Sequence, residues 1–251
     1  MHWRGWSVSH DFDEDKTLSG ITISGHNVII GVEGFQEVER ELGKLKVKTP
    51  AVTKFAVNKT ARYARKMMIM QAKARYAVNA AGARHLKDLV QRKKATNSSI
   101  TAELFISSLR NDLGYFETSP SSPYMGRNVF HAPTYFKGHV LKGSPMKELT
   151  GTGRLSKGFL LKFNKSGHVG MVQRVIGKKS KHTKTEKGYK RWVSKSGVVE
   201  TLQTMGSPSA TAMHNTVWPI VSPDVETFLE NALIMRAEQV LAVARSKAKR
   251  R

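Results

Sequence analysis

The chain contains no cysteine and few acidic residues, and both shortages limit what it can do. Without cysteine there is no disulfide framework, no cysteine-ligated zinc site and no thiol nucleophile. Its 251 residues include only 19 Asp and Glu against 42 Lys and Arg, which gives a formal net charge of +23. A charge this far from zero indicates an anionic partner. Nucleic acid is the first expectation, and a membrane surface or an acidic protein is the alternative.

Long hydrophobic runs are also missing. No stretch approaches the roughly 18 apolar residues that a membrane span requires. The opening residues lead into the acidic run Asp11 to Asp15 rather than into the apolar core of a signal peptide. We therefore expect a soluble, unexported protein that assembles in the cytoplasm and does not contact a membrane.

The acidic residues form no recognisable metal-binding pattern near the N-terminus. Asp11, Asp13 and Asp15 alternate like the first ligands of a calcium loop. However, Lys16 and Thr22 stand where such a loop needs Gly and Glu. We interpret the three aspartates as an exposed acidic patch.

Other patterns for cofactor or catalytic chemistry also fail on spacing. The nine histidines include no helical pair spaced for zinc. The glycine-rich run 151–158 matches neither a dinucleotide loop nor a triphosphate loop. A metal-dependent nuclease needs several converging carboxylates, and the nearest pair, Asp224 and Glu226, is better explained as the first turn of a helix. The sequence therefore predicts no catalytic residue, no cofactor and no metal site.

Hydrophobic spacing predicts an α+β fold, in which a long N-terminal helix packs on a small mixed or antiparallel sheet, with a C-terminal helix and extended loops. Residues 1–33 are expected to form an N-terminal arm or hairpin, because two β-branched runs, 21–23 and 28–30, flank a plausible turn. Residues 34–251 are expected to form a single domain with loop excursions at 114–158 and 178–195.

Three helices are predicted from apolar residues that recur every three or four positions. The first runs from Phe35 through Leu45. Thr49 is expected to cap the second helix, with Pro50 at its first position. The third is expected to begin at Ser222 as N-cap, followed by Pro223. The apolar stripe predicted for the second helix consists of Val52, Ala56, Thr60, Tyr63, Met67, Met70, Ala74, Ala77 and Ala81.

Strands are predicted where β-branched and aromatic residues cluster. Residues 100–107 have this composition. Residues 159–163 and 168–175 flank a turn and are expected to form a hairpin, and 191–193 and 198–202 are expected to form a second one.

Two basic segments carry the main functional signal. Between Ala51 and Lys94 there are 12 Lys and Arg and one acidic residue, and between Lys178 and Lys195 there are eight Lys and Arg and one Glu. Such segments can neutralise phosphates without reading bases, or can remain a solvated cationic face. The residues expected to contact DNA or another anionic partner are Arg62, Arg65, Lys66, Lys73, Lys178, Lys179, Lys181, Lys184, Lys187, Lys190 and Arg191.

Two stretches resemble the phage minor tail protein Z family, the tail-completion proteins of long-tailed phages. The first runs from Gly34 to Leu42 and on through Thr49-Pro50-Ala51 to Ala61, where a short amphipathic helix precedes a long basic one. The second is residues 168–178, His-Val-Gly-Met-Val-Gln-Arg-Val-Ile-Gly-Lys, which is similar to a strand and Gly-Lys turn of that family. The closing helix also fits the family pattern. Residues 1–30, 114–158 and 178–195 depart from it.

The resemblance implies an α+β fold related to other head-tail connector proteins, and a structural role without catalytic residues. It implies a homo-oligomeric ring, six-fold by analogy with the tail, in the tail or neck of a virion assembled in the host cytoplasm. The implied neighbours are the tail terminator, the tail tube and the head-completion or connector proteins, with genomic DNA passing through the channel. Two other hypotheses remain: a sequence-nonspecific nucleic-acid-binding protein and, third, a metal-dependent nuclease.

Overall fold

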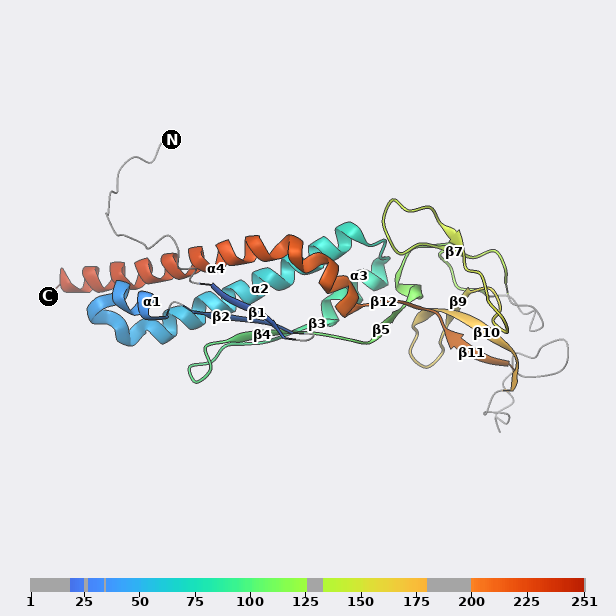
Figure 1. Ribbon diagram of the computed structural model, residues 1–251, viewed down its shortest axis with the longest axis horizontal. Coiled ribbons are helices and arrows are strands. Elements are labelled where there is room, and N and C mark those ends of the chain that lie inside the picture. The colour runs from blue at the N-terminus through green and yellow to red at the C-terminus, as the bar shows by residue number, and fades with distance from the viewer. Residues whose placement is uncertain (1–18, 25–26, 34, 126–132, 180–199, 251) are drawn as a thin grey trace. The chain divides into compact units, whose positions relative to one another are not determined.

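The computed structural model describes residues 19–24, 27–33, 35–125, 133–179 and 200–250 (Figure 1). Its contacts divide the chain into two compact units. Unit 1 comprises Met1–Arg65, Arg92–Phe105 and Ser222–Arg251, and unit 2 comprises Lys66–Gln91 and Ile106–Val221. Helices and antiparallel strands occur in both units, so the α+β class predicted from the sequence is confirmed. Among the described residues, no helix has the length and apolar character needed to cross a membrane.

Unit 1 contains an antiparallel sheet that starts with the predicted hairpin. Strands β1 (Ser19–Ser24) and β2 (Asn27–Val32) pair with Ile21 opposite Ile30. β2 also pairs with β4 (Ala102–Ile106), and β3 (Val90–Lys93) completes the order β1-β2-β4-β3. Successive side chains of a strand point to opposite faces, and one face is buried through Val28, Ile30 and Leu104.

Two long helices pack together in unit 1, where they lie side by side (Figure 1). They are α2 (Thr49–Arg75) and α4 (Ala210–Ala248). The ring of Tyr63 on α2 stacks on that of Phe228 on α4 at a centroid distance of 4.1 Å. Val52 and Leu229 are fully buried in this unit, so apolar burial stabilises the pair of helices.

The helix before α2 is shorter than predicted. α1 (Phe35–Leu42) stops at Gly43, which has a φ of +48°, a conformation that glycine adopts without steric cost. The chain continues as the 3-10 helix η1 (Gly43–Lys48), so Leu45 is not part of α1. The prediction that Thr49 caps α2 is also wrong, because Thr49 lies inside the helix and its hydroxyl donates to the carbonyl of Lys46 at 2.7 Å.

The predicted stripe of α2 is correct only in its first half. Beyond Ala61 the buried positions are Ala64, Met68 and Ala72, whereas Met70 is 47% exposed. The helix ends at Arg75, since the next residues form β-bridges, Tyr76 with Leu141 and Val78 with Phe116. A separate helix, α3 (Ala80–Asp88), follows and is capped by the Asn79 side chain, which accepts from the amide of Gly82 at 2.9 Å.

The last helix begins thirteen residues earlier than predicted. Ser209, not Ser222, caps it: its hydroxyl accepts from the amide of Ala212 at 3.2 Å. Ser222 and Pro223 lie inside α4. A buried residue recurs every fourth position across the prolines, and this stripe outweighs the local helix-start signal. Its members are Met213, Val217, Val221, Val225, Leu229 and Leu233.

Unit 2 holds three small antiparallel sheets. The predicted hairpin forms as β9 (Phe159–Lys162) and β10 (Val169–Lys179), and β11 (Glu200–Thr204) pairs on the other side of β10. Residues 191–193, the expected hairpin partners of residues 198–202, lie outside the described residues. The 114–158 excursion contains short strands β6 (Thr118–Ser119), β7 (Lys137–Gly138) and β8 (Lys147–Glu148), and β5 (Arg110–Asp112) pairs with β12 (Gly206–Ser209).

Candidate functional site

A cationic stripe runs along α2. Lys59, Arg62, Lys66 and Lys73 follow one another at spacings of three, four and seven residues, and such spacings place side chains on one side of a helix. Arg62 and Lys66 are exposed, and Lys73 is half-buried. In the part of the chain that the structure describes, these three cations form no hydrogen bond or ion pair. Their charges are therefore available to an outside partner.

In unit 1 a cation from a neighbouring β-strand lies beside this stripe. Arg92, from β3, is half-buried and reaches α2, where its guanidinium donates to the carbonyl of Asn58 at 3.4 Å. Burial lowers the pKa of Arg92, and the neighbouring charges of Arg62 and Arg65 lower it further. The guanidinium groups of Arg62 and Arg65 are thus close enough to that of Arg92 to disfavour its charge. We call Lys59, Arg62, Arg65 and Arg92 the cationic surface of unit 1.

The backbone beyond β3 is fixed on α2 by two side chains of that helix. Asn58 donates to the carbonyl of Ala95 and accepts from its amide, both at 3.0 Å. One turn earlier on α2, Lys54 donates to the side chain of Asn97. These contacts hold the end of β3 against the helix, and Arg92 is placed beside the helix arginines as a consequence.

The chemistry of this surface suits oxyanions. A guanidinium presents several donors in a plane and binds phosphate or carboxylate in a two-point geometry. An anion placed among the arginines would also relieve their mutual repulsion, since opposite charges at short range favour the charged forms. The surface offers no base-reading pattern, so contact with nucleic acid here would be independent of sequence.

The second predicted basic segment is described only at its start. Lys178 and Lys179 belong to the end of β10, so these two residues are not part of the loop that was predicted to begin at residue 178. The remaining predicted contacts, Lys181, Lys184, Lys187, Lys190 and Arg191, lie outside the described residues. The structure therefore brings together the helix cations of unit 1 and adds Arg92, which sequence spacing could not connect to α2.

A polar cluster in unit 2 was missed by sequence reasoning. Asp112 accepts from the amides of Gly114 and Met171 at 2.7 and 2.9 Å, and its other oxygen lies 2.8 Å from Nε2 of His168. The ring of Tyr115 stacks on His85 at 4.0 Å and lies 4.9 Å from His168. Burial raises the pKa of Tyr115, and the charge of Asp112 raises it further.

This cluster has a structural task. Each oxygen of Asp112 already has a partner, and two of its three contacts fix backbone, so the carboxylate ties η2 (Leu113–Tyr115) to β10. Adding a Cβ to Gly114 would bring it within 2.6 Å of the Val169 carbonyl, which shows how closely these segments approach. No signal in the sequence relates Asp112 to His168, because they are 56 residues apart.

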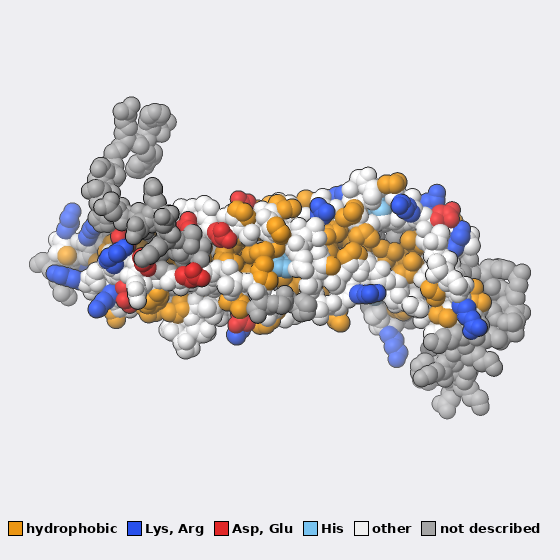
Figure 2. All heavy atoms as spheres, viewed as in Figure 1, with side chains coloured by type: hydrophobic (Ala, Val, Ile, Leu, Met, Phe, Trp, Pro, Cys, Tyr) orange, Lys and Arg blue, Asp and Glu red, His pale blue; other side chains and the backbone are white. Residues whose placement is uncertain are grey.

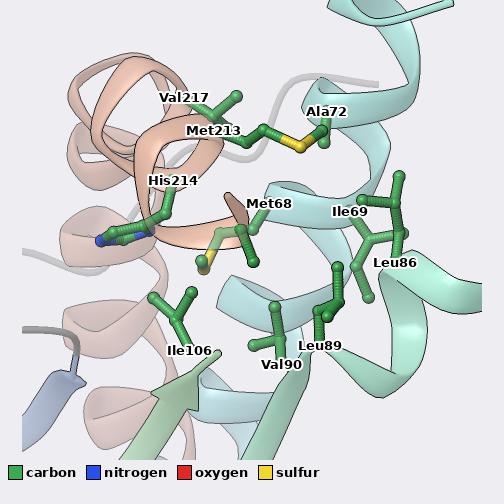
Figure 3. A pocket seen from close by; sticks show the side chains of 11 residues that line it. Met68, Ile69, Ala72, Leu86, Leu89, Val90, Ile106, Met213, His214 and Val217 are labelled. Carbon is green, nitrogen blue, oxygen red and sulfur yellow. The ribbon is translucent and has the colours of Figure 1, made fainter. Parts of the chain in front are cut away.

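An apolar cavity lies elsewhere in unit 2, where side chains from α2, α3 and α4 converge (Figure 3). The volume of the cavity is about 30 Å³. His214 lines the cavity, is 4% exposed, and its Nδ1 has no hydrogen-bond partner among the described atoms. Burial lowers the pKa of His214 from 6.5 to about 4, so the ring is neutral at pH 7.

Comparisons with models of known protein families, with curated proteins and with solved structures find no match for the chain. Among the described residues, no three His, Asp or Glu side chains are grouped so that they could hold a metal ion.

Proposed function

We propose that this chain is a structural, non-catalytic subunit of a tailed-bacteriophage particle. In this proposal it is a tail-completion or neck protein whose copies form a ring around the path of the DNA. The cationic surface and the stripe on α2 are its contacts with an anionic partner. Its neighbours are further copies of itself, the tail terminator and tail tube proteins, and the head-completion or connector proteins.

The observation that carries the proposal is the set of cations on α2 that have no described partner. Arg62 is exposed on α2, and Arg92 is held beside this helix by hydrogen bonds from its own guanidinium and to the backbone that follows β3. Cations fixed in this way keep their charge in one place. Cyclic symmetry repeats such a patch in every copy, so a modest surface on one copy recurs at every position of the ring.

The resemblance to the minor tail protein Z family supports the same role. It involves the start of α2 and strand β10, which are both well-formed elements of the fold. The second candidate is a sequence-nonspecific nucleic-acid-binding protein, which the net charge of +23 favours.

Native mass spectrometry combined with electron microscopy of the purified full chain separates the two candidates. The proposal expects a closed ring, six-fold by analogy with a tail, and weak binding of duplex DNA by any residual monomer at moderate salt. A chain that stays monomeric at all concentrations and binds duplex DNA tightly as a monomer would favour the second candidate. DNA cleavage that depends on a divalent metal ion would contradict both.

A further inference from the structure

The outward side of α4 in unit 1 is acidic, against the charge of the whole chain. From Ser222 to Glu238 the helix carries four acidic residues and one basic residue, Arg236. Arg236 is occupied within the unit, because its guanidinium lies 4.7 Å from the ring centroid of Phe55. In Figure 2, red acidic side chains lie next to orange hydrophobic ones over this stretch of α4.

Four residues of α4 form a ridge at spacings of four: Glu226, Glu230, Ile234 and Glu238. Positions separated by four lie above one another on a helix. Glu226 and Glu238 are exposed, Glu230 is half-buried and Ile234 is 44% exposed. No ion pair or hydrogen bond joins the three glutamates to any other residue within the described ranges. We call these four residues the acidic ridge.

The ring contacts that join α2 and α4 within one copy do not involve the acidic ridge. The two helices already pack through other residues, since Tyr63 stacks on Phe228 and the Lys59 ammonium lies 5.6 Å from the centre of the same ring. Val225, Leu229 and Leu233 each stand one position before a ridge residue and are buried in the unit. Adjacent residues of a helix point about 100° apart, so the ridge lies beside this buried row and is exposed at Glu226, Ile234 and Glu238.

We propose that the acidic ridge of one copy docks on the cationic surface of a second copy. The two surfaces are complementary in charge, and each includes apolar area, Ile234 in the ridge and Phe55, which is 40% exposed, on α2 beside Lys59. The inference rests on the proposed function and names the partner of the cationic surface. Because the two surfaces differ, the contact is head-to-tail and leaves one free surface at each end until a ring closes.

In such a contact, charge complementarity contributes more to specificity than to affinity. A single exposed ion pair contributes roughly 0–1 kcal/mol, so the pairing sets the partner and the register. Like charges at the same places are strongly unfavourable, and a charge reversal on either surface should therefore stop assembly.

A charge-swap experiment tests the contact in the full chain by native mass spectrometry. The ridge variant carries Glu226→Lys and Glu230→Lys, and the surface variant carries Lys59→Glu and Arg62→Glu. Each variant alone should lose the ring, with association weakened by about 100-fold or more. An equimolar mixture should recover rings with alternating variants and hence an even number of subunits. Circular dichroism confirms that each variant is folded, and the neutral pair Glu226→Gln and Glu230→Gln is expected to weaken assembly less.

The outcomes separate this inference from the proposed function. If both variants still form rings by themselves, the docking contact is wrong while the ring remains. If the surface variant forms rings but no longer binds DNA, the cationic surface serves nucleic acid and the inference is overturned. If the unmodified chain forms no ring under any condition, the proposed ring itself fails.

Discussion

The side chain of Asn58 forms two hydrogen bonds of 3.0 Å with the backbone of Ala95, one to its carbonyl oxygen and one from its amide. The side-chain amide bonds to both the N–H and the C=O of Ala95, as the backbone of a neighbouring strand would. It holds the segment after β3 against α2. It places Arg92 beside Arg62 and Arg65, where burial lowers the pKa of Arg92 and the two neighbouring charges lower it further. A single amide side chain thus connects the fold of unit 1 to its cationic surface.

Replacing Asn58 with Ala should lower the free energy of unfolding by about 1–3 kcal/mol, because two backbone groups lose their partners at a site where Ala95 is 5% exposed. Chemical denaturation with circular dichroism measures the loss. The matched control is Asn97→Ala, which removes an exposed contact to Lys54 on the same segment and should change stability by less than about 0.5 kcal/mol. An equal loss of unfolding free energy in the two variants would show that Asn58 does not hold this segment on α2.

Glycine at position 114 is required by the approach of β10. Gly114→Ala would place a Cβ 2.6 Å from the carbonyl oxygen of Val169 and 2.8 Å from Cα of Gly170, and backbone atoms cannot easily move away. We expect a destabilisation of about 1–3 kcal/mol. Gly138→Ala is the control, because its Cβ would meet atoms no closer than 3.5 Å. A similar melting temperature for both variants would contradict this account.

His214 should make stability depend on pH. Burial lowers its pKa from 6.5 to about 4, so the folded state binds the proton more weakly than the unfolded state does. Its contribution is complete above pH 6.5 and is lost as the pH falls towards 4. The loss is up to about 3 kcal/mol, since each pH unit is worth about 1.4 kcal/mol. His214→Leu should flatten the curve of unfolding free energy against pH between 6.5 and 4. Parallel curves for the two proteins would refute the assignment.

The charges on α2 should matter for partners and not for folding. The triple variant Arg62→Gln, Lys66→Gln and Lys73→Gln should keep its unfolding free energy within about 0.5 kcal/mol per substitution, because none of the three has a described partner. Binding to the anionic partner should weaken, and its dependence on salt should become shallower. In particles, unjoined tails would indicate a protein partner, and joined but leaking particles would indicate DNA. Normal titres and normal particles would show a merely solvated face.

Local patterns predicted much of the fold. The β1–β2 and β9–β10 hairpins formed where alternating apolar runs flank a turn, and β4 lies within the predicted strand 100–107. The start of α4 was missed because Ser222-Pro223 is a strong local helix-start signal, whereas burial of Met213 and Val217 within unit 2 decides the outcome. Tertiary packing overrides such signals, and sequence spacing alone does not report it.

The candidate site was predictable only in part. Helical spacing identified Arg62 and Lys66, since residues on one helix share a face by periodicity. Arg92 and the Asp112–His168 pair join residues that are far apart in the chain, and no periodic pattern links such positions. All four residues of the acidic ridge lie within the closing helix that the sequence predicts, but recognising the ridge requires the burial of the neighbouring row of α4, which spacing does not report.

The central claim is that this chain is a ring-forming structural component of a phage particle. The most direct test is quantitative mass spectrometry of purified particles, together with electron microscopy of particles labelled by an antibody against the chain. The account predicts a fixed small number of copies per particle, consistent with one ring, and label at the junction of head and tail. Absence of the chain from purified particles, or a single copy in each, would contradict it.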